Sequence, residues 1–218
     1  MSILVVGFAA FPGVSRNPSQ DLVESLARRV PSEVATLVLD VSWEASWPRL
    51  EAEIRRRGAR TVLMFGAHLR AERFRVELVA RNRRELGRAD AFGGFPAGPS
   101  VGDGPERLPC RLDWAHVARA LREAGVDFEW STNAGSYLCN DTLYRLALAA
   151  DAIGVERFGF FHLPSSDEGI EALLAHPPLP DVFLSLPMER IEAAGLALIE
   201  MAATSSGARP GEMIPPRE

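Results

Sequence analysis

Apolar and polar positions follow a repeated order along this chain, in which a short apolar run precedes a stretch with helical spacing. The first apolar run covers residues 3–8 and leads into a turn-rich segment, as is typical of a buried strand that enters a loop. A helix is predicted next, because Asn17 occupies an N-cap position and Pro18 the first helical position. Apolar residues then recur at helical spacing, namely Leu22, Val23, Leu26 and Val30.

The same order predicts the remaining elements. Further strands are predicted at residues 34–41, 61–65, 127–131 and 155–162, and a partly alternating segment predicts one more at residues 74–80. Helices are predicted at residues 47–57, after the capping residue Asp113, from Ser136 or Tyr137 onward, and after Pro187. Residues 87–109 are dense in Gly and Pro, and this composition predicts extended loops.

Repeated strand-then-helix order predicts an α/β protein, specifically a single-domain three-layer α/β/α sandwich with a mainly parallel or mixed sheet. Residues 1–204 are expected to form the catalytic domain, and residues 205–218 are interpreted as a polar C-terminal tail. In such sheets ligands bind beyond the carboxyl ends of the strands. The residues expected in that region are Phe8, Phe11, Gly66, Cys139 and His162.

Composition narrows the classes of function. The chain has 218 residues, of which 47% are hydrophobic, so one substantial core is expected. Acidic residues outnumber basic ones, 29 to 24, which argues against nucleic acid as a partner. No apolar run approaches the roughly 20 residues of a membrane span, and we find no secretory signal, so no membrane association and a cytoplasmic location are expected. The two cysteines lack the clustering of a zinc site, and no metal or other cofactor is expected.

Cys139 falls in the first turn of a predicted helix, where unpaired backbone amides and the helix dipole favour an anionic thiolate. The same amides are suited to an oxyanion. From position alone, however, a buried structural cysteine is favoured over a catalytic one, because free cysteines are often buried.

A cysteine nucleophile requires a proton shuttle, and His162 is the best placed of the four histidines because it ends an apolar strand. From position alone, a capping or loop histidine is an equally open interpretation of His162. His116 and His176 are interpreted as structural or solvated. Glu77 is a candidate for orienting the imidazole, although its alternating pattern favours a side chain that points to solvent.

Three blocks resemble the pyroglutamyl peptidase type I family, also called pyrrolidone-carboxylate peptidases. Residues 6–11 with Asn17-Pro18-Ser19 are similar to the family's first strand and helix start. Residues 131–140, which read STNAGSYLCN, resemble the most specific family motif, and residues 159–164, which read GFFHLP, resemble a family strand end. The likeness covers approximately residues 3–164.

The resemblance implies a cysteine peptidase, an omega-exopeptidase that hydrolyses the amide bond after an N-terminal pyroglutamyl residue of small peptides. It implies Cys139 as nucleophile, His162 as general acid and base, and Glu77 as the residue that orients the histidine. It also implies that Phe8 and Phe11 hold the lactam ring, that Leu138 and Asn17 contribute to substrate binding, and that the protein forms a homo-oligomer.

One block departs from the family pattern. The family reads Gly-x-Ala-Gly-Gly-Arg ahead of its glutamate, whereas residues 66–71 read GAHLRA. In addition, the family arginine near the oxyanion site aligns with Gly87, next to Arg88. These differences motivate two alternatives, a related thiol amidohydrolase that acts on another small cyclic or capped N-terminal group, and a catalytically silent homologue that binds a small molecule or peptide.

Overall fold

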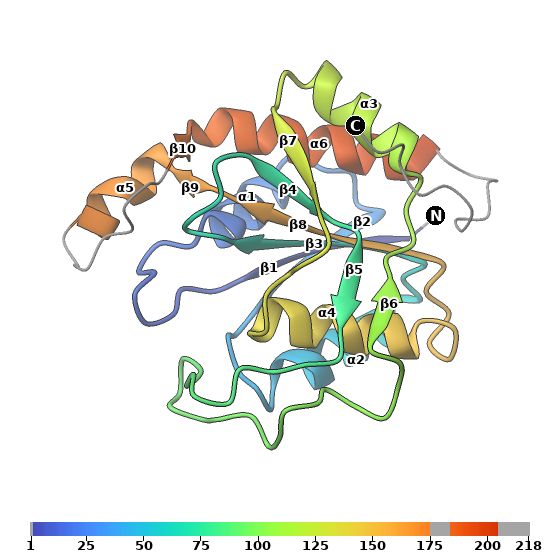
Figure 1. Cartoon of the computed structure of the whole chain (residues 1–218). Helices are drawn as coiled ribbons and strands as arrows, with labels where there is room; N and C mark the ends of the chain where they lie inside the picture. The colour runs from blue at the N-terminus through green and yellow to red at the C-terminus, as the bar shows by residue number, and fades with distance from the viewer. Residues whose placement is uncertain (1, 175–183, 205–218) are drawn as a thin grey trace.

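The computed structural model describes residues 2–174 and 184–204. A six-stranded sheet with the strand order β2-β1-β3-β8-β4-β7 forms its centre (Figure 1). The strands are β1 (Ile3–Phe8), β2 (Val34–Leu39), β3 (Thr61–Ala67), β4 (Phe74–Glu77), β7 (Phe128–Ser131) and β8 (Arg157–Leu163). Neighbouring pairs are parallel except β4 and β8, which run antiparallel, so the sheet is mixed.

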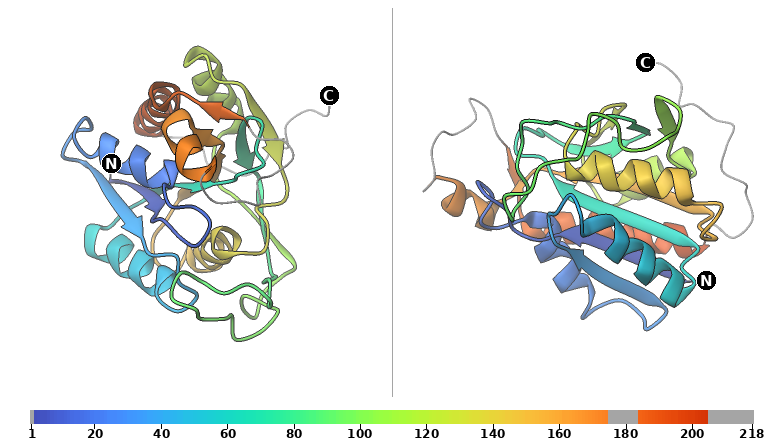
Figure 2. Two further views of the ribbon diagram at one scale, coloured as in Figure 1. Left: turned by 90° about the vertical axis from the view of Figure 1, so that its left-hand side faces the viewer. Right: turned by 90° about the horizontal axis from the view of Figure 1, so that it is seen from below.

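Helices cover both faces of the sheet and complete the predicted three layers. Figure 2 shows the cyan α2 (Ser46–Arg57) and the yellow α4 (Leu138–Ala149) on one side. The other side carries α1 (Pro18–Leu26), α3 (Trp114–Glu123) and α6 (Met188–Thr204). Each face has its own apolar core: Met64, Phe158 and Phe160 pack toward α2 and α4, whereas Leu63, Phe65 and Phe161 pack toward α1, α3 and α6.

The structure has two strands where a single strand was predicted at residues 74–80, so that prediction was wrong in this detail. The chain leaves the main sheet after Glu77, and the carbonyl of Leu78 accepts a hydrogen bond of 2.9 Å from the amide of Cys110. The next three residues form β5 (Val79–Arg81), which pairs antiparallel with β6 (Arg107–Pro109). Since β6 falls inside the segment interpreted as extended loops, that interpretation was also incomplete.

Three short elements were not predicted, namely β9 (Ser165–Ser166), α5 (Asp167–Leu174) and β10 (Ser185–Leu186). The predicted tail, residues 205–218, lies outside the described residues. No helix in the described part of the chain is both long and apolar enough to cross a membrane.

The start of α1 packs directly on β1 because Gly7 has no side chain. A Cβ at Gly7 would meet the carbonyl oxygen of Ser19 at 2.3 Å. Asn17 caps the helix by accepting a 3.0 Å hydrogen bond from the Ser19 amide, and its side chain donates to the carbonyl of Ala9. The hydroxyl of Ser19 accepts a hydrogen bond from the Phe8 amide. The predicted Asn-Pro-Ser helix start therefore holds the end of β1 in place.

Candidate active site

Glu77 and His162 are brought together by the antiparallel register of β4 and β8. Glu77 lies opposite Phe160 and Arg75 lies opposite His162, so these four side chains share one face of the sheet. The diagonal pair meets, and Nδ1 of His162 lies 2.8 Å from Oε1 of Glu77. Glu77 is 0% exposed, so its interpretation as a solvent-facing residue was wrong. The face that bears Glu77 and His162 is covered by α4.

Cys139 lies in the first turn of α4, above the centre of the sheet. Its sulfur occupies the space that a side chain at Gly66 would fill, since a Cβ there would meet Sγ of Cys139 at 3.1 Å and the Phe160 ring at 2.8 Å. Gly66 is the register partner of His162 in the parallel pair of β3 and β8. The thiol, the imidazole and the carboxylate therefore converge from α4, β8 and β4.

The contacts within this group favour a protonated imidazole at His162 and an ionised carboxylate at Glu77. Burial opposes protonation of His162, but hydrogen bonds to Cys139 and Glu77 raise the pKa of His162 to about 9. Burial also opposes ionisation of Glu77, yet the hydrogen bond from His162, with help from Ser131 and Arg75, holds the pKa of Glu77 below its ordinary value. Because Nδ1 of His162 is engaged by Glu77, Nε2 is the nitrogen left for the thiol.

The second cysteine has a different environment. Cys110 is 6% exposed, and burial raises the pKa of its thiol far above the ordinary value. Cys139 is only partly buried. A buried, protonated thiol is a poor nucleophile, so the two cysteines differ in expected reactivity.

An aromatic cluster lies beside Cys139, built around Tyr137 at the N-cap position of α4. The ring of Tyr137 lies 6.1 Å from Phe11 and 5.2 Å from Trp43, measured between centroids. The guanidinium carbon of Arg88 is 4.0 Å from the centre of the Tyr137 ring. The Tyr137 hydroxyl donates to the carbonyl of Ala89, which fixes the ring against the loop after β5. Arg88 is distant from Cys139 in sequence, but it lies next to the start of α4 in space.

The residues expected to bind substrate occupy different environments. Phe8 is 2% exposed and packs 6.2 Å from Phe160, whereas Phe11 is half-buried and faces Tyr137. Leu138 is 1% exposed and belongs to the core beneath α4. Asn17 is 2% exposed and its side chain is engaged by the capping contacts described above. The sequence patterns did not identify Trp43 or Tyr137 as site residues, although Tyr137 belongs to the motif at residues 131–140.

Asn140, the residue after Cys139, has a structural role that explains its place in the motif. Its side chain accepts a 2.9 Å hydrogen bond from the Arg81 amide and donates to the carbonyls of Arg81 and Arg83. Asp141 adds a buried ion pair of 2.6 Å with Arg84. These contacts tie the loop after β5 to the first turn of α4.

Two further polar residues lie at the site and were not assigned from the sequence. His68 lies with its ring centroid 5.3 Å from that of His162, at an interplanar angle of 73°. Nε of Arg75 lies 3.6 Å from Oε1 of Glu77. Neither residue could be assigned to the site from the sequence, because each lies beside His162 on β8, which is distant in sequence. Of the other histidines, His116 pairs with Asp113 on α3 at 2.8 Å, and His176 lies outside the described residues.

A thiol next to a buried imidazole and carboxylate, on a three-layer α/β fold, is typical of the cysteine hydrolases. The model of the pyroglutamyl peptidase family matches residues 1–203, so this chain belongs to that family.

Relatives and solved structures agree with this assignment. The pyrrolidone-carboxylate peptidase of Streptomyces coelicolor is 31% identical over 196 residues, which cover 88% of this chain and 90% of that protein. The corresponding protein of Pectobacterium carotovorum is 29% identical over 222 residues, covering 95% and 98% of the two chains. The crystal structure of the pyrrolidone carboxyl peptidase from Fervidobacterium islandicum superposes with a TM-score of 0.84 at 26% identity, covering 93% of this chain and 98% of that one.

Proposed function

We propose that this protein is a cysteine peptidase that hydrolyses the amide bond after an N-terminal pyroglutamyl residue of small peptides. The observation that carries the proposal is the convergence of Cys139, His162 and Glu77, in which the buried His162–Glu77 pair is 2.8 Å long. The membership of the family and the similarity to pyrrolidone-carboxylate peptidases supply the substrate class.

The proposed reaction begins with attack of the Cys139 thiolate on the carbonyl carbon of the pyroglutamyl residue. A carbon–sulfur bond forms, and the carbonyl electrons move to oxygen. When the carbon–nitrogen bond breaks, His162 donates its proton to the departing amine. Water then attacks the thioester while His162 accepts a proton from it, and the thiolate leaves with free pyroglutamate as the product. Glu77 stabilises the positive imidazole and keeps its Nδ1 oriented throughout.

The first turn of α4 is the proposed oxyanion site. Within the described residues, the N-cap residue Tyr137 makes no side-chain hydrogen bond to the helix. The first amides of a helix have no intrahelical partner, so those of α4 are available to a negatively charged oxygen. This is the same turn that carries Cys139.

The lactam ring is proposed to bind against the aromatic cluster. Pyroglutamate has no charged amino group, so flat aromatic surface is suited to hold it, and Phe11 and Tyr137 supply such a surface next to Cys139. Phe8 is proposed to support this surface from beneath through Phe160. Leu138 and Asn17 are proposed to act on the pocket indirectly, through the core and the cap to which they belong.

The test is release of a chromogenic amine from a pyroglutamyl arylamide by the wild-type protein and two cysteine variants. Cys139→Ala is expected to lose all measurable hydrolysis, and Cys110→Ala, as the matched control, is expected to retain it. Hydrolysis by Cys139→Ala would overturn the assignment of the nucleophile. Failure of the wild-type protein to hydrolyse the substrate would support the catalytically silent alternative.

A second candidate function is favoured by the altered segment 66–71, which brings His68 to the site. In this candidate the same thiol chemistry acts on another small cyclic or capped N-terminal group. Parallel assays of pyroglutamyl, acetyl, formyl and unblocked aminoacyl arylamides decide between the two. Faster hydrolysis of any of the others would replace the pyroglutamyl assignment.

A further inference from the structure

His68 is held beside the catalytic histidine by the end of the sheet. It directly follows β3, and its amide donates a 2.9 Å hydrogen bond to the carbonyl of Leu163, the residue after His162. Its own carbonyl accepts from the amide of Ala71, which closes a tight turn. The backbone of His68 is therefore fixed on both sides, and its ring meets that of His162 edge to face.

The imidazole of His68 has unused hydrogen-bonding capacity. Its Nδ1 is buried and has no hydrogen-bond partner among the residues that the structure describes. Burial, the positive charge of His162 and that of Arg75 lower the pKa of His68 to about 4, so the ring is neutral near pH 7. A neutral imidazole has one N–H donor and one nitrogen acceptor. Although Nδ1 is itself buried, the residue as a whole is only partly buried, so part of it is open to a bound molecule.

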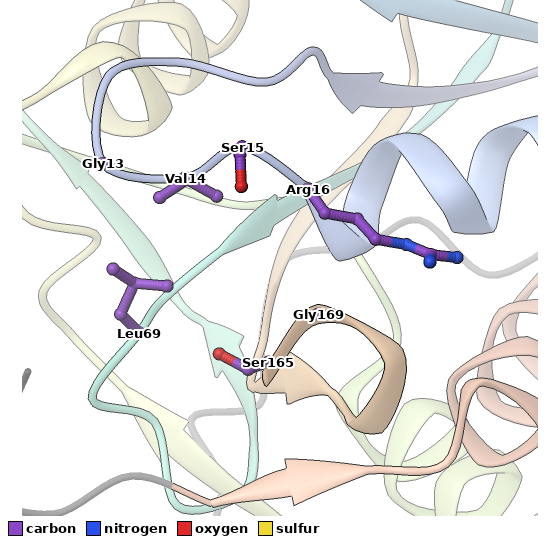
Figure 3. Close-up of a pocket in the computed structure, with 7 residues that line it drawn as sticks. All are labelled: Gly13, Val14, Ser15, Arg16, Leu69, Ser165 and Gly169. Atoms are coloured by element: carbon purple, nitrogen blue, oxygen red, sulfur yellow. The ribbon is translucent and has the colours of Figure 1, made fainter. Parts of the chain in front are cut away.

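A small pocket lies beside the residues that follow His68 and His162 in the chain. Figure 3 shows that its lining includes Leu69, the residue after His68, and Ser165, three residues after His162, with residues 13–16 and Gly169 completing the wall. Phe11 and Val14 pair through two backbone hydrogen bonds. This turn separates the two sites, because Phe11 belongs to the aromatic cluster and Val14 to the pocket.

We propose that His68 contacts the leaving half of the substrate: its imidazole hydrogen-bonds to the main chain of the residue after the scissile bond, and that residue's side chain points toward the pocket of Figure 3. The proposal rests on the proposed function, since it assigns the lactam ring to the aromatic cluster on the other side of the Phe11–Val14 turn. The ligand class is a peptide with a main-chain carbonyl and amide after the pyroglutamyl residue. An arylamide lacks these groups.

The test compares two substrates, pyroglutamyl-alanine amide and a pyroglutamyl arylamide, on the full-length chain. The variants are His68→Ala, His68→Phe, which keeps a flat ring against His162, and His68→Gln, which keeps a donor and an acceptor. For Ala and Phe, kcat/KM is expected to fall three- to tenfold more on the peptide than on the arylamide, about the effect of one lost hydrogen bond. Gln is expected to restore most of this difference.

The controls separate the proposal from other causes. Arg70→Ala changes the exposed neighbour of His68 and is expected to leave the ratio of the two kcat/KM values within about twofold of wild type. Rates of Cys139 alkylation report whether each variant retains its folded site. Equal losses on both substrates would mean that His68 acts only through His162 or the fold, and would overturn the proposal, as would no loss on either. If the wild-type protein cleaved neither substrate, the proposed function itself would fail.

Discussion

Oε1 of Glu77 and Nδ1 of His162 lie 2.8 Å apart, in residues that are 0% and 2% exposed. A carboxylate in this position acts on the reaction only through the imidazole. Glu77→Gln keeps the shape of the side chain but removes its charge, and the amide disfavours the protonated ring. We expect kcat on a pyroglutamyl arylamide to fall by at least about tenfold with a smaller change in KM. A wild-type kcat in this variant would show that the charge of Glu77 does not assist the reaction.

The pH dependence of activity follows from the same pair. The pKa of His162 is raised to about 9, so its protonated form predominates below that pH and is lost above it. Since His162 donates the proton to the leaving amine, kcat/KM is expected to fall as the pH rises past about 9. In Glu77→Gln this decline should begin at a lower pH, because one of the partners that raise the pKa has lost its charge. A decline at the same pH in both proteins would assign it to another group.

Gly66 provides a steric test of the position of Cys139. In Gly66→Ala the new methyl group would approach the Phe160 ring at 2.8 Å and Sγ of Cys139 at 3.1 Å. Both neighbours belong to the buried site, so we expect a loss of stability of about 1–3 kcal/mol, measured by urea unfolding. We also expect kcat on a pyroglutamyl arylamide to fall further than in the control variant. Gly87→Ala is the matched control, because no described atom lies within 4 Å of the Cβ that it would add.

Asn140 is expected to stabilise the fold rather than take part in the reaction. In Asn140→Ala the Arg81 amide and two carbonyls lose their partner in a buried place, and we expect unfolding to become easier by about 2–4 kcal/mol. Asn133→Ala, at an exposed turn, should change stability by less than about 0.5 kcal/mol. Equal effects of the two substitutions in urea titrations would contradict this role.

The two cysteines are expected to react at different rates with iodoacetamide. Cys139 is only partly buried and contacts an imidazole, whereas burial keeps the thiol of Cys110 protonated. Mass spectrometry of the native protein should therefore find label on Cys139 first, and Cys139→Ala should remain unlabelled over the same time. Comparable labelling of Cys110 would show that its burial is incomplete in solution.

The layers of the fold could be predicted from the sequence because caps and hydrophobic spacing are local signals. Asn17 and Asp113 cap α1 and α3, as predicted. The hairpin of β5 and β6 could not be predicted, because its two strands are separated by 25 residues of loop from 82 to 106 and pair only in three dimensions.

The candidate site was predictable only in part for the same reason. Cys139 and His162 stand at element ends, where sequence patterns are informative. Glu77 was misread by pattern alone, because alternation along one strand does not reveal that α4 covers its polar face. His68 depends on the neighbouring strand β8 and therefore had no signal of its own.

The central strand β8 has a consequence for how the protein resists local opening. All seven of its residues are buried, and it is hydrogen-bonded to β3 on one side and to β4 on the other. Segments of this kind exchange their amide hydrogens only when the whole domain unfolds. The strand that carries His162 should therefore be among the last to lose protection in native-state hydrogen exchange, while the surface loops around it open and close many times.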